Sequence, residues 1–152
     1  MPASDELEAI RQLKYRYFRA LDTKDWALLA DTLTEDATTS YDEGRYAFTG
    51  REAILDFLRG ALGSPRIVSM HHGHHPEIEL TSDGTARGTW YLEDLVILRD
   101  ANTIVRGAAF YTDEYLRVGG EWKIAATGYR RTYEWIEVPS EPMSLRTAFD
   151  QT

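Results

Sequence analysis

The sequence predicts an α+β domain in which helices come first and a curved antiparallel sheet follows. In the first half of the chain, three segments carry apolar residues at three- and four-residue steps. From residue 67 onward the chain changes to long segments rich in β-branched and aromatic residues. Helices followed by antiparallel strands describe a sheet with helices on one face, and long twisted strands that curl around a helix enclose a concave space.

Three helices are expected before residue 64. The apolar stripe of the first consists of Leu7, Ile10, Leu13, Tyr17 and Leu21. After a break at residues 22–25, Asp25 or Thr23 caps a second helix, which carries Trp26, Leu29 and Leu33. A Thr-rich strand at 37–41 and a turn at 42–44 follow. Residues 49–52 fit a capping box for a third helix, and Gly63 fits its end.

Four long strands are expected in the second half, at residues 67–80, 86–98, 103–118 and 122–135. Turns at 82–84, 100–102 and 119–120 separate them, so the strands form a meander of hairpins. We expect one domain over residues 1–152, with 137–152 as a C-terminal tail or lid that Pro139 and Pro142 interrupt.

Composition excludes several classes of binding partner. The net charge of −8 argues against sequence-independent binding of nucleic acid or anionic membranes, which needs clustered Lys and Arg. No apolar run approaches the roughly 18 residues of a membrane span. The absence of cysteine excludes disulfides, thiolate metal sites and thiol nucleophiles. We therefore expect a cytoplasmic protein that binds neither nucleic acid nor membrane.

Aromatic residues are abundant, with nine Tyr, five Phe and four Trp among 152 residues. They can fill a core and an oligomer interface, or they can line a site for a flat apolar ligand. The sequence leaves both explanations open. We expect a homo-oligomer, a dimer or a trimer, and a small apolar cyclic molecule as ligand.

Asp94 stands out inside an apolar strand. The residues that share its parity are otherwise apolar, namely Trp90, Leu92, Val96 and Leu98. A carboxylate on a buried face is costly unless it is paired or hydrogen-bonded. It could form a structural ion pair with an arginine such as Arg106, Arg130 or Arg131, or it could belong to a pocket.

Tyr17 and Asp22 both lie near the end of the first predicted helix, about 140° apart around its axis. Tyr17 lies on the apolar stripe, so it is either a core tyrosine or a pocket phenol. Asp22 is either a loop or cap residue or a functional acid. A carboxylate at a helix C-terminus meets an unfavourable dipole, which favours a special role.

All four histidines lie within residues 71–75. On a strand, His71 and His75 share one face, and His72 and His74 share the other. Imidazole and carboxylate groups can hold zinc, but adjacent histidines point apart and no HExxH sequence exists, so we expect no metal. One histidine facing the cavity would suit proton transfer, because imidazole titrates near neutral pH. His74 and His75, beside Pro76, are candidates for surface residues.

Sequence patterns for other chemistries are missing. The chain has no GxSxG elbow, no Walker A loop and no GxGxxG after a strand. Acyl transfer, phosphoryl transfer and dinucleotide binding are therefore not expected, and neither is a cofactor.

Three segments resemble the SnoaL-like branch of the NTF2-like superfamily. They are Tyr17-Phe18-Arg19-Ala20-Leu21-Asp22-Thr23-Lys24-Asp25-Trp26, Tyr111-Thr112-Asp113-Glu114-Tyr115 and Gly120-Glu121-Trp122-Lys123-Ile124. The resemblance covers nearly the whole chain and implies a cone-shaped, cystatin-like α+β roll around a deep pocket. This superfamily contains enzymes and non-enzymes.

Within the superfamily, the pattern is most similar to scytalone dehydratase, the bile acid 7α-dehydratases and hexachlorocyclohexane dehydrochlorinase. The resemblance implies an Asp–His pair that acts as the base in cofactor-free elimination, with Asp22 and His71 at the matching positions. Tyr17 and Asp94 match further pocket residues of the bile acid dehydratase pattern.

The same resemblance implies substrate-binding residues. An arginine on the last strand belongs to the pattern, and parity allows only one of Arg130 and Arg131 to face the pocket. Tyr41 matches a substrate-positioning tyrosine of scytalone dehydratase. Leu21 stands where that enzyme has a tyrosine, and its second active-site histidine has no counterpart here. Scytalone itself is therefore not the expected substrate.

The sequence supports the hypothesis of a cofactor-independent lyase that removes water from an apolar cyclic substrate such as a steroid or polyketide. His71, oriented by Asp22, would take a proton from carbon, and Tyr17 or a protonated Asp94 would donate to the leaving group. The alternatives are a double-bond isomerase of a similar substrate and a non-catalytic ligand-binding or assembly module.

Overall fold

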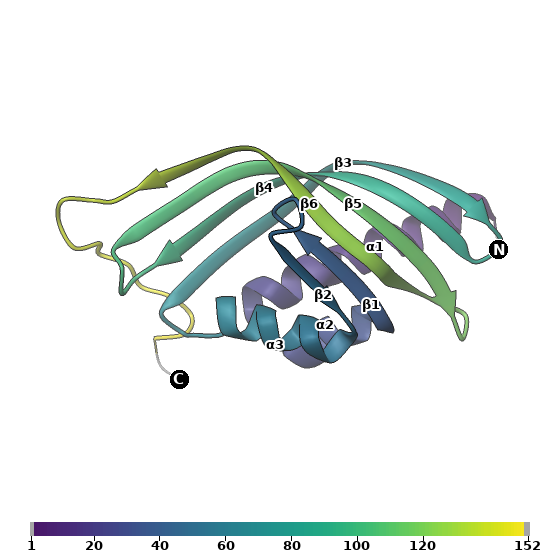
Figure 1. Cartoon of the computed structure of the whole chain (residues 1–152), viewed down its shortest axis with the longest axis horizontal. Helices are drawn as coiled ribbons and strands as arrows, with labels where there is room; N and C mark the ends of the chain where they lie inside the picture. The colour runs from purple at the N-terminus through teal and green to yellow at the C-terminus, as the bar shows by residue number, and fades with distance from the viewer. Residues whose placement is uncertain (1, 151–152) are drawn as a thin grey trace.

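Four long strands arch over three helices in the computed structural model, which describes residues 2–150 (Figure 1). The helices are α1 (Ala3–Thr23), α2 (Trp26–Thr32) and α3 (Arg51–Leu62). The long strands are β3 (Ile67–Ser82), β4 (Thr85–Leu98), β5 (Thr103–Val118) and β6 (Glu121–Glu137). Two shorter strands, β1 (Leu33–Tyr41) and β2 (Tyr46–Thr49), complete the sheet. This architecture confirms the predicted α+β class.

The sheet is mixed and not purely antiparallel as expected. Its strand order is β2-β1-β6-β5-β4-β3, and β1 pairs with β6 in parallel, with Thr39 opposite Thr127. The difference arises because β3 forms the edge of the sheet opposite to β2. The meander runs from β3 through β4 and β5, and so its last strand, β6, lies beside β1. The final strand therefore lies in the interior of the sheet. The short strand β2, which pairs with β1, was also not predicted.

One of the two predicted helix starts is confirmed. The Asp25 side chain accepts a hydrogen bond of 3.0 Å from the Leu28 amide and caps α2. The expected capping box of α3 is wrong, because Thr49 ends β2 and Gly50 occupies the N-cap with no side-chain cap. Gly50 has a φ of 95°, a conformation that suits glycine.

The apolar stripe of α1 packs on the inner face of the sheet. Ile10, Leu13, Tyr17 and Leu21 are buried there. Gly73 on β3 permits the close approach, because a Cβ at this position would overlap the ring of Phe18. Because glycine has no side chain, the end of α1 can lie next to β3.

Residues 138–150 form an irregular tail. The side-chain amide of Asn102 donates to the carbonyls of Pro139 and Glu141 at 3.0 and 3.1 Å, and Arg99 donates to the carbonyl of Leu145 at 3.0 Å. The tail therefore lies against the turn between β4 and β5. No helix within residues 2–150 has the length and apolar character needed to cross a bilayer.

Candidate active site

A cavity of about 400 Å³ lies between the helices and the inner face of the sheet. This volume is within the range of small-molecule sites. Most of its lining is apolar or aromatic, and His71, Asp94 and Arg131 are the lining residues with an ionisable group other than phenol. The remaining lining residues are Tyr17, Leu21, Tyr41, Tyr46, Phe57, Leu58, Ala61, Leu62, Leu92, Val96, Val105, Tyr111 and Tyr129.

Asp22 and His71 meet at the wall of this cavity. Asp22 Oδ1 lies 2.7 Å from His71 Nδ1, and Asp22 Oδ2 accepts a 2.8 Å hydrogen bond from the His71 backbone amide. Ser69 Oγ donates to Asp22 Oδ1 at 2.8 Å. The carboxylate therefore contacts both the ring and the backbone of His71, which fixes the imidazole in one orientation.

This geometry assigns the protons of the imidazole. A carboxylate only accepts hydrogen bonds, so Nδ1 of His71 is the donor in the contact with Asp22. The lone pair of the neutral ring then resides on Nε2. The His71 ring stacks near Phe18, with ring planes 11° apart, and its side chain is 10% exposed. An imidazole held in this way can accept a proton at Nε2.

The end of α1 is fixed by Lys24. This residue is the C-cap in a left-handed conformation, with a φ of 57°. Its ammonium group donates to the carbonyls of Leu62 and of Ile67, the latter at 2.7 Å. These contacts tie the helix end to the connection between α3 and β3, and so hold Asp22 beside the start of β3. Burial lowers the pKa of Lys24, and the nearby charge of Asp22 opposes that shift.

Tyr17 and Tyr41 form a hydrogen-bonded pair at the cavity, with their hydroxyl oxygens 2.6 Å apart. Burial raises the pKa of both phenols well above 10.0, and electrostatic repulsion from neighbouring tyrosines adds to the effect, while the hydrogen bond with Tyr41 opposes it at Tyr17. Both hydroxyls therefore keep their protons at neutral pH. One of the two protons serves the hydrogen bond between the phenols.

Asp94 and Arg131 form an ion pair that faces the cavity. Arg131 Nη2 donates to Asp94 Oδ2 at 2.9 Å, and Nη1 donates to Asp94 Oδ1. Burial disfavours the charged guanidinium, but Asp94 outweighs this effect and the pKa of Arg131 is raised. Gly107 leaves room for the guanidinium, since a Cβ there would overlap it. Asp94 therefore has both of the roles that the sequence left open: it forms an ion pair with an arginine, and it lines a pocket. The expectation of a protonated Asp94 as proton donor needs correction, because both carboxylate oxygens accept from Arg131.

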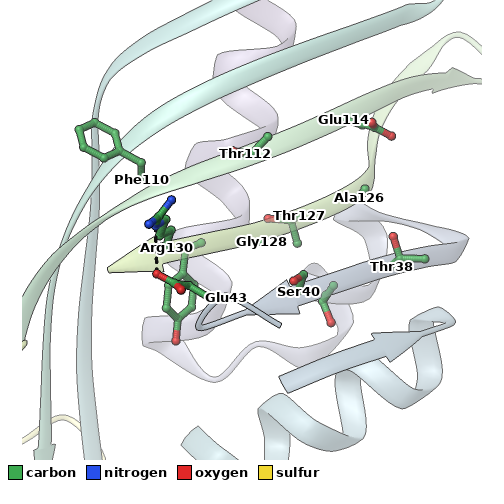
Figure 2. Close-up of a pocket in the computed structure, with 12 residues that line it drawn as sticks. Thr38, Ser40, Glu43, Phe110, Thr112, Glu114, Ala126, Thr127, Gly128 and Arg130 are labelled. Carbon is green, nitrogen blue, oxygen red and sulfur yellow. Dashed lines mark hydrogen bonds and ion pairs between the residues drawn. The ribbon is translucent and has the colours of Figure 1, made fainter. Parts of the chain in front are cut away.

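Arg130 points away from the cavity, which corrects its expected role in substrate binding. Figure 2 shows it on a separate outer groove, where its Nε donates to Glu43 Oε1 at 3.0 Å. On β6, Arg131 lies opposite Ala109 and Arg130 lies opposite Phe110, so the two arginines fall on opposite faces of the sheet. Arg131 is the arginine that lines the cavity.

A buried ion pair behind the cavity was not predicted. Lys14 Nζ lies 2.8 Å from Asp113 Oδ2, and both side chains are fully buried. Tyr115 and Thr127 donate to the same carboxylate at 2.7 and 2.6 Å. The signal was present in the sequence, because Lys14 falls on the apolar stripe four residues after Ile10.

The other histidines lie outside the cavity. His72, His74 and His75 are exposed, and none of them belongs to the cavity lining. His75 has a φ of 48° where the pairing of β3 with β4 shifts register. His71 is the one histidine of the four that lines the cavity.

Known proteins resemble this chain in sequence and in fold over most of its length. Over 117 residues, the chain is 28% identical to hexachlorocyclohexane dehydrochlorinase 1 of Sphingobium indicum, covering 77% of this chain and 75% of the relative. The crystal structure of a type 2 hexachlorocyclohexane dehydrochlorinase (LinA) superimposes with a TM-score of 0.81 at 25% identity, covering 93% of this chain and 94% of that one.

A scytalone dehydratase-like protein of Novosphingobium aromaticivorans has the same fold. Its structure superimposes with a TM-score of 0.78 at 24% identity, covering 94% of this chain and 91% of that one. The SnoaL-like domain family matches residues 2–128. The recognised resemblance is thereby confirmed, and the chain belongs to the SnoaL-like domain family.

Proposed function

We propose that the protein is a cofactor-independent lyase that eliminates water, or a similar leaving group, from an apolar cyclic substrate. The observation that carries the proposal is the 2.7 Å contact between Asp22 and His71 at the wall of an apolar cavity. A base that is oriented by a carboxylate and faces a mostly apolar cavity is suited to abstracting a proton from carbon.

In the proposed reaction, Nε2 of His71 takes a proton from a carbon next to a carbonyl or conjugated acyl group. The electron pair of the broken C–H bond becomes the new carbon–carbon double bond. The leaving group departs from the neighbouring carbon with its bonding pair. Asp22 stabilises the imidazolium that forms, because its carboxylate already accepts from Nδ1.

The phenol pair provides the acid on the other side of the reaction. The hydroxyl proton of Tyr17 or Tyr41 would be donated to a departing hydroxyl, or would bind a carbonyl oxygen. Arg131, held by Asp94, adds a fixed positive charge on the cavity wall. In this scheme Asp94 positions Arg131 and does not donate a proton itself.

The cavity favours a ring-shaped, uncharged substrate such as a steroid or polyketide. Aromatic and aliphatic side chains make up most of its wall, and the charges of Arg131 and Asp94 compensate each other. The relative hexachlorocyclohexane dehydrochlorinase acts, by its name, on a chlorinated ring. Elimination from a cyclic compound is thus consistent with the site and with the relative.

The test is incubation of the purified protein with hydroxylated steroids and polyketides, followed by mass spectrometry. Loss of one water molecule from a substrate supports the proposal. His71→Ala should reduce turnover by about a hundred- to ten-thousandfold, the usual contribution of one general base. Arg130→Ala, an arginine outside the cavity, is the matched control and should retain full turnover.

Two results would overturn the proposal. Full turnover in both His71→Ala and Asp22→Ala would remove the dyad from the chemistry. A product of unchanged mass with a shifted double bond would instead identify an isomerase, which uses the same base but returns the proton elsewhere.

A further inference from the structure

We propose that His72, His74 and Glu93 form a surface site for one divalent transition metal ion, with Zn²⁺ as the expected ligand. The three residues lie on the outer face of β3 and β4, and their ligand atoms are all within 4.8 Å of one another. No metal was expected from the sequence, because adjacent histidines point apart and no HExxH sequence exists. In the structure, Glu93 on the neighbouring strand supplies a carboxylate beside His72.

Strand geometry brings the three side chains together. His72 and His74 are two residues apart on β3, so their side chains share one face, and their ring centres are 5.9 Å apart. Glu93 on β4 is the direct cross-strand partner of His72. His71 belongs to the opposite face and to the cavity. The same alternation therefore separates the proposed metal site from the proposed catalytic site.

The distances fit a tetrahedral ion. Zinc bonds of about 2.0–2.1 Å place neighbouring ligand atoms roughly 3.3 Å apart. His74 Nε2 lies 3.4 Å from Glu93 Oε1, and His72 Nδ1 lies 3.7 Å from the same oxygen. The ligand atoms thus need to move only by tenths of an ångström on these two edges. All three side chains are at least 43% exposed, which leaves them free to adjust.

The chemistry of the three groups favours a borderline metal. Two imidazoles and one carboxylate are the protein ligands of several zinc sites, in which water takes the fourth position. Hard ions such as Mg²⁺ prefer all-oxygen ligands and are not expected here. Within residues 2–150, the ion-pair partners of Glu93 are these two histidines, with no Lys or Arg among them. A cation at this position would meet a carboxylate that no permanent positive charge neutralises.

The location suggests what a bound ion would do. β3 is an edge strand of the sheet, and the ion would link it to β4. Such a link stabilises the folded chain, because the unfolded chain does not bring the three ligands together. The proposed site would brace the strand that carries His71.

The test is isothermal titration of the full chain with zinc chloride and, separately, magnesium chloride. The protein must carry no polyhistidine tag, since a tag would bind the same ions. We expect one Zn²⁺ per chain, no Mg²⁺ binding and a higher Tm in the presence of Zn²⁺. His72→Ala and His74→Ala should each weaken zinc binding roughly tenfold or more, and the double variant should abolish it.

Two matched variants complete the design. His75→Asn removes a neighbouring exposed histidine but keeps a residue that tolerates the positive φ, and it should bind Zn²⁺ unchanged. Asp22→Asn disrupts the catalytic dyad and should also bind Zn²⁺ unchanged, so the two proposals fail separately. The inference is overturned if Zn²⁺ in excess gives no heat and no change in Tm, or if the double variant binds as the unaltered chain does.

Discussion

The ammonium group of Lys14 lies 2.8 Å from the carboxylate of Asp113, and neither side chain reaches solvent. Lys14 Nζ also lies 3.7 Å from the ring centre of Tyr111 and 4.5 Å from that of Tyr17, two residues that line the cavity. Cation–π contacts of this kind are strengthened when water is excluded. The ion pair thus forms a polar layer between the core and the aromatic wall of the site.

Removal of Lys14 should destabilise the fold. Lys14→Met leaves Asp113 buried without its cation, and the loss of one partner of a buried pair costs about 3–5 kcal/mol. Urea unfolding measures the change in the free energy of unfolding. Arg87→Ala, which breaks an exposed ion pair with Glu79, is the control and should cost about 0–1 kcal/mol. A Lys14→Met variant as stable as the control would contradict this account.

Replacement of Asp22 by Asn should abolish most turnover and leave the fold intact. The Asn amide can donate to His71 Nδ1, which would place the ring proton on Nε2 and remove the base. We expect kcat to fall by about a hundred- to ten-thousandfold. Ser69→Ala removes one of the three hydrogen bonds to the same carboxylate, and it should have a much smaller effect. Equal losses in the two variants would argue against a role for the imidazole tautomer.

The hydroxyl groups of Tyr17 and Tyr41 should act together in the proposed reaction. Tyr17→Phe and Tyr41→Phe each break the 2.6 Å hydrogen bond, and each should lower kcat by about a hundredfold, the lower range for an acid group. The double variant should lose little more than either single variant, because residues that act together give non-additive effects. Tyr15→Phe, an exposed position on α1, serves as the control. Additive losses would show that the two hydroxyls act separately.

Stability should fall steeply above about pH 10. Burial raises the pKa of four phenols well above 10.0, namely those of Tyr17, Tyr41, Tyr111 and Tyr115. The unfolded chain releases these protons near pH 10 while the folded chain retains them, so each phenol contributes up to about 1.4 kcal/mol of lost stability per pH unit.

Lys14 acts in the opposite direction at alkaline pH. Burial lowers its pKa, so between that lowered pKa and 10.5 the unfolded chain binds the proton more readily and stability rises with pH. Lys24, whose pKa burial also lowers, acts in the same direction as Lys14. Two lysines against four phenols leave the net slope negative above about pH 10, where the phenols of the unfolded chain titrate. Urea unfolding from neutral pH to about pH 11, with phenolate absorbance recorded in parallel, tests the sum. Tyr111→Phe should flatten the decline, and stability that is constant through this range would refute the assignment.

Much of the fold was predictable because its longest elements have the clearest patterns. The predicted strand at 103–118 matches β5 at both ends, and the stripe through Ile10 and Tyr17 is buried as expected. Asp22 and His71 were chosen from a family resemblance, and the structure places them in contact. Local periodicity and a matched motif were sufficient for these features.

Features that depend on strand register were not predictable. The position of Glu93 beside His72 requires the register of β3 with β4, and no local pattern fixes that register. The parallel pairing of β1 with β6 joins segments almost ninety residues apart, as at Thr39 and Thr127. The choice between Arg130 and Arg131 depends on an irregularity in the pairing of β5 with β6, opposite Ala108 and Ala109. Each of these is a property of two strands and not of one.

The interior position of β6 has a consequence for biosynthesis. Tyr129 and Arg131 belong to this last strand, which lies between β1 and β5. During translation, β1 and β5 each keep an unpaired edge until residues 121–137 have left the ribosome. The cavity therefore cannot form on the nascent chain before β6 is made, and truncation ahead of that strand removes part of the cavity lining and the centre of the sheet together.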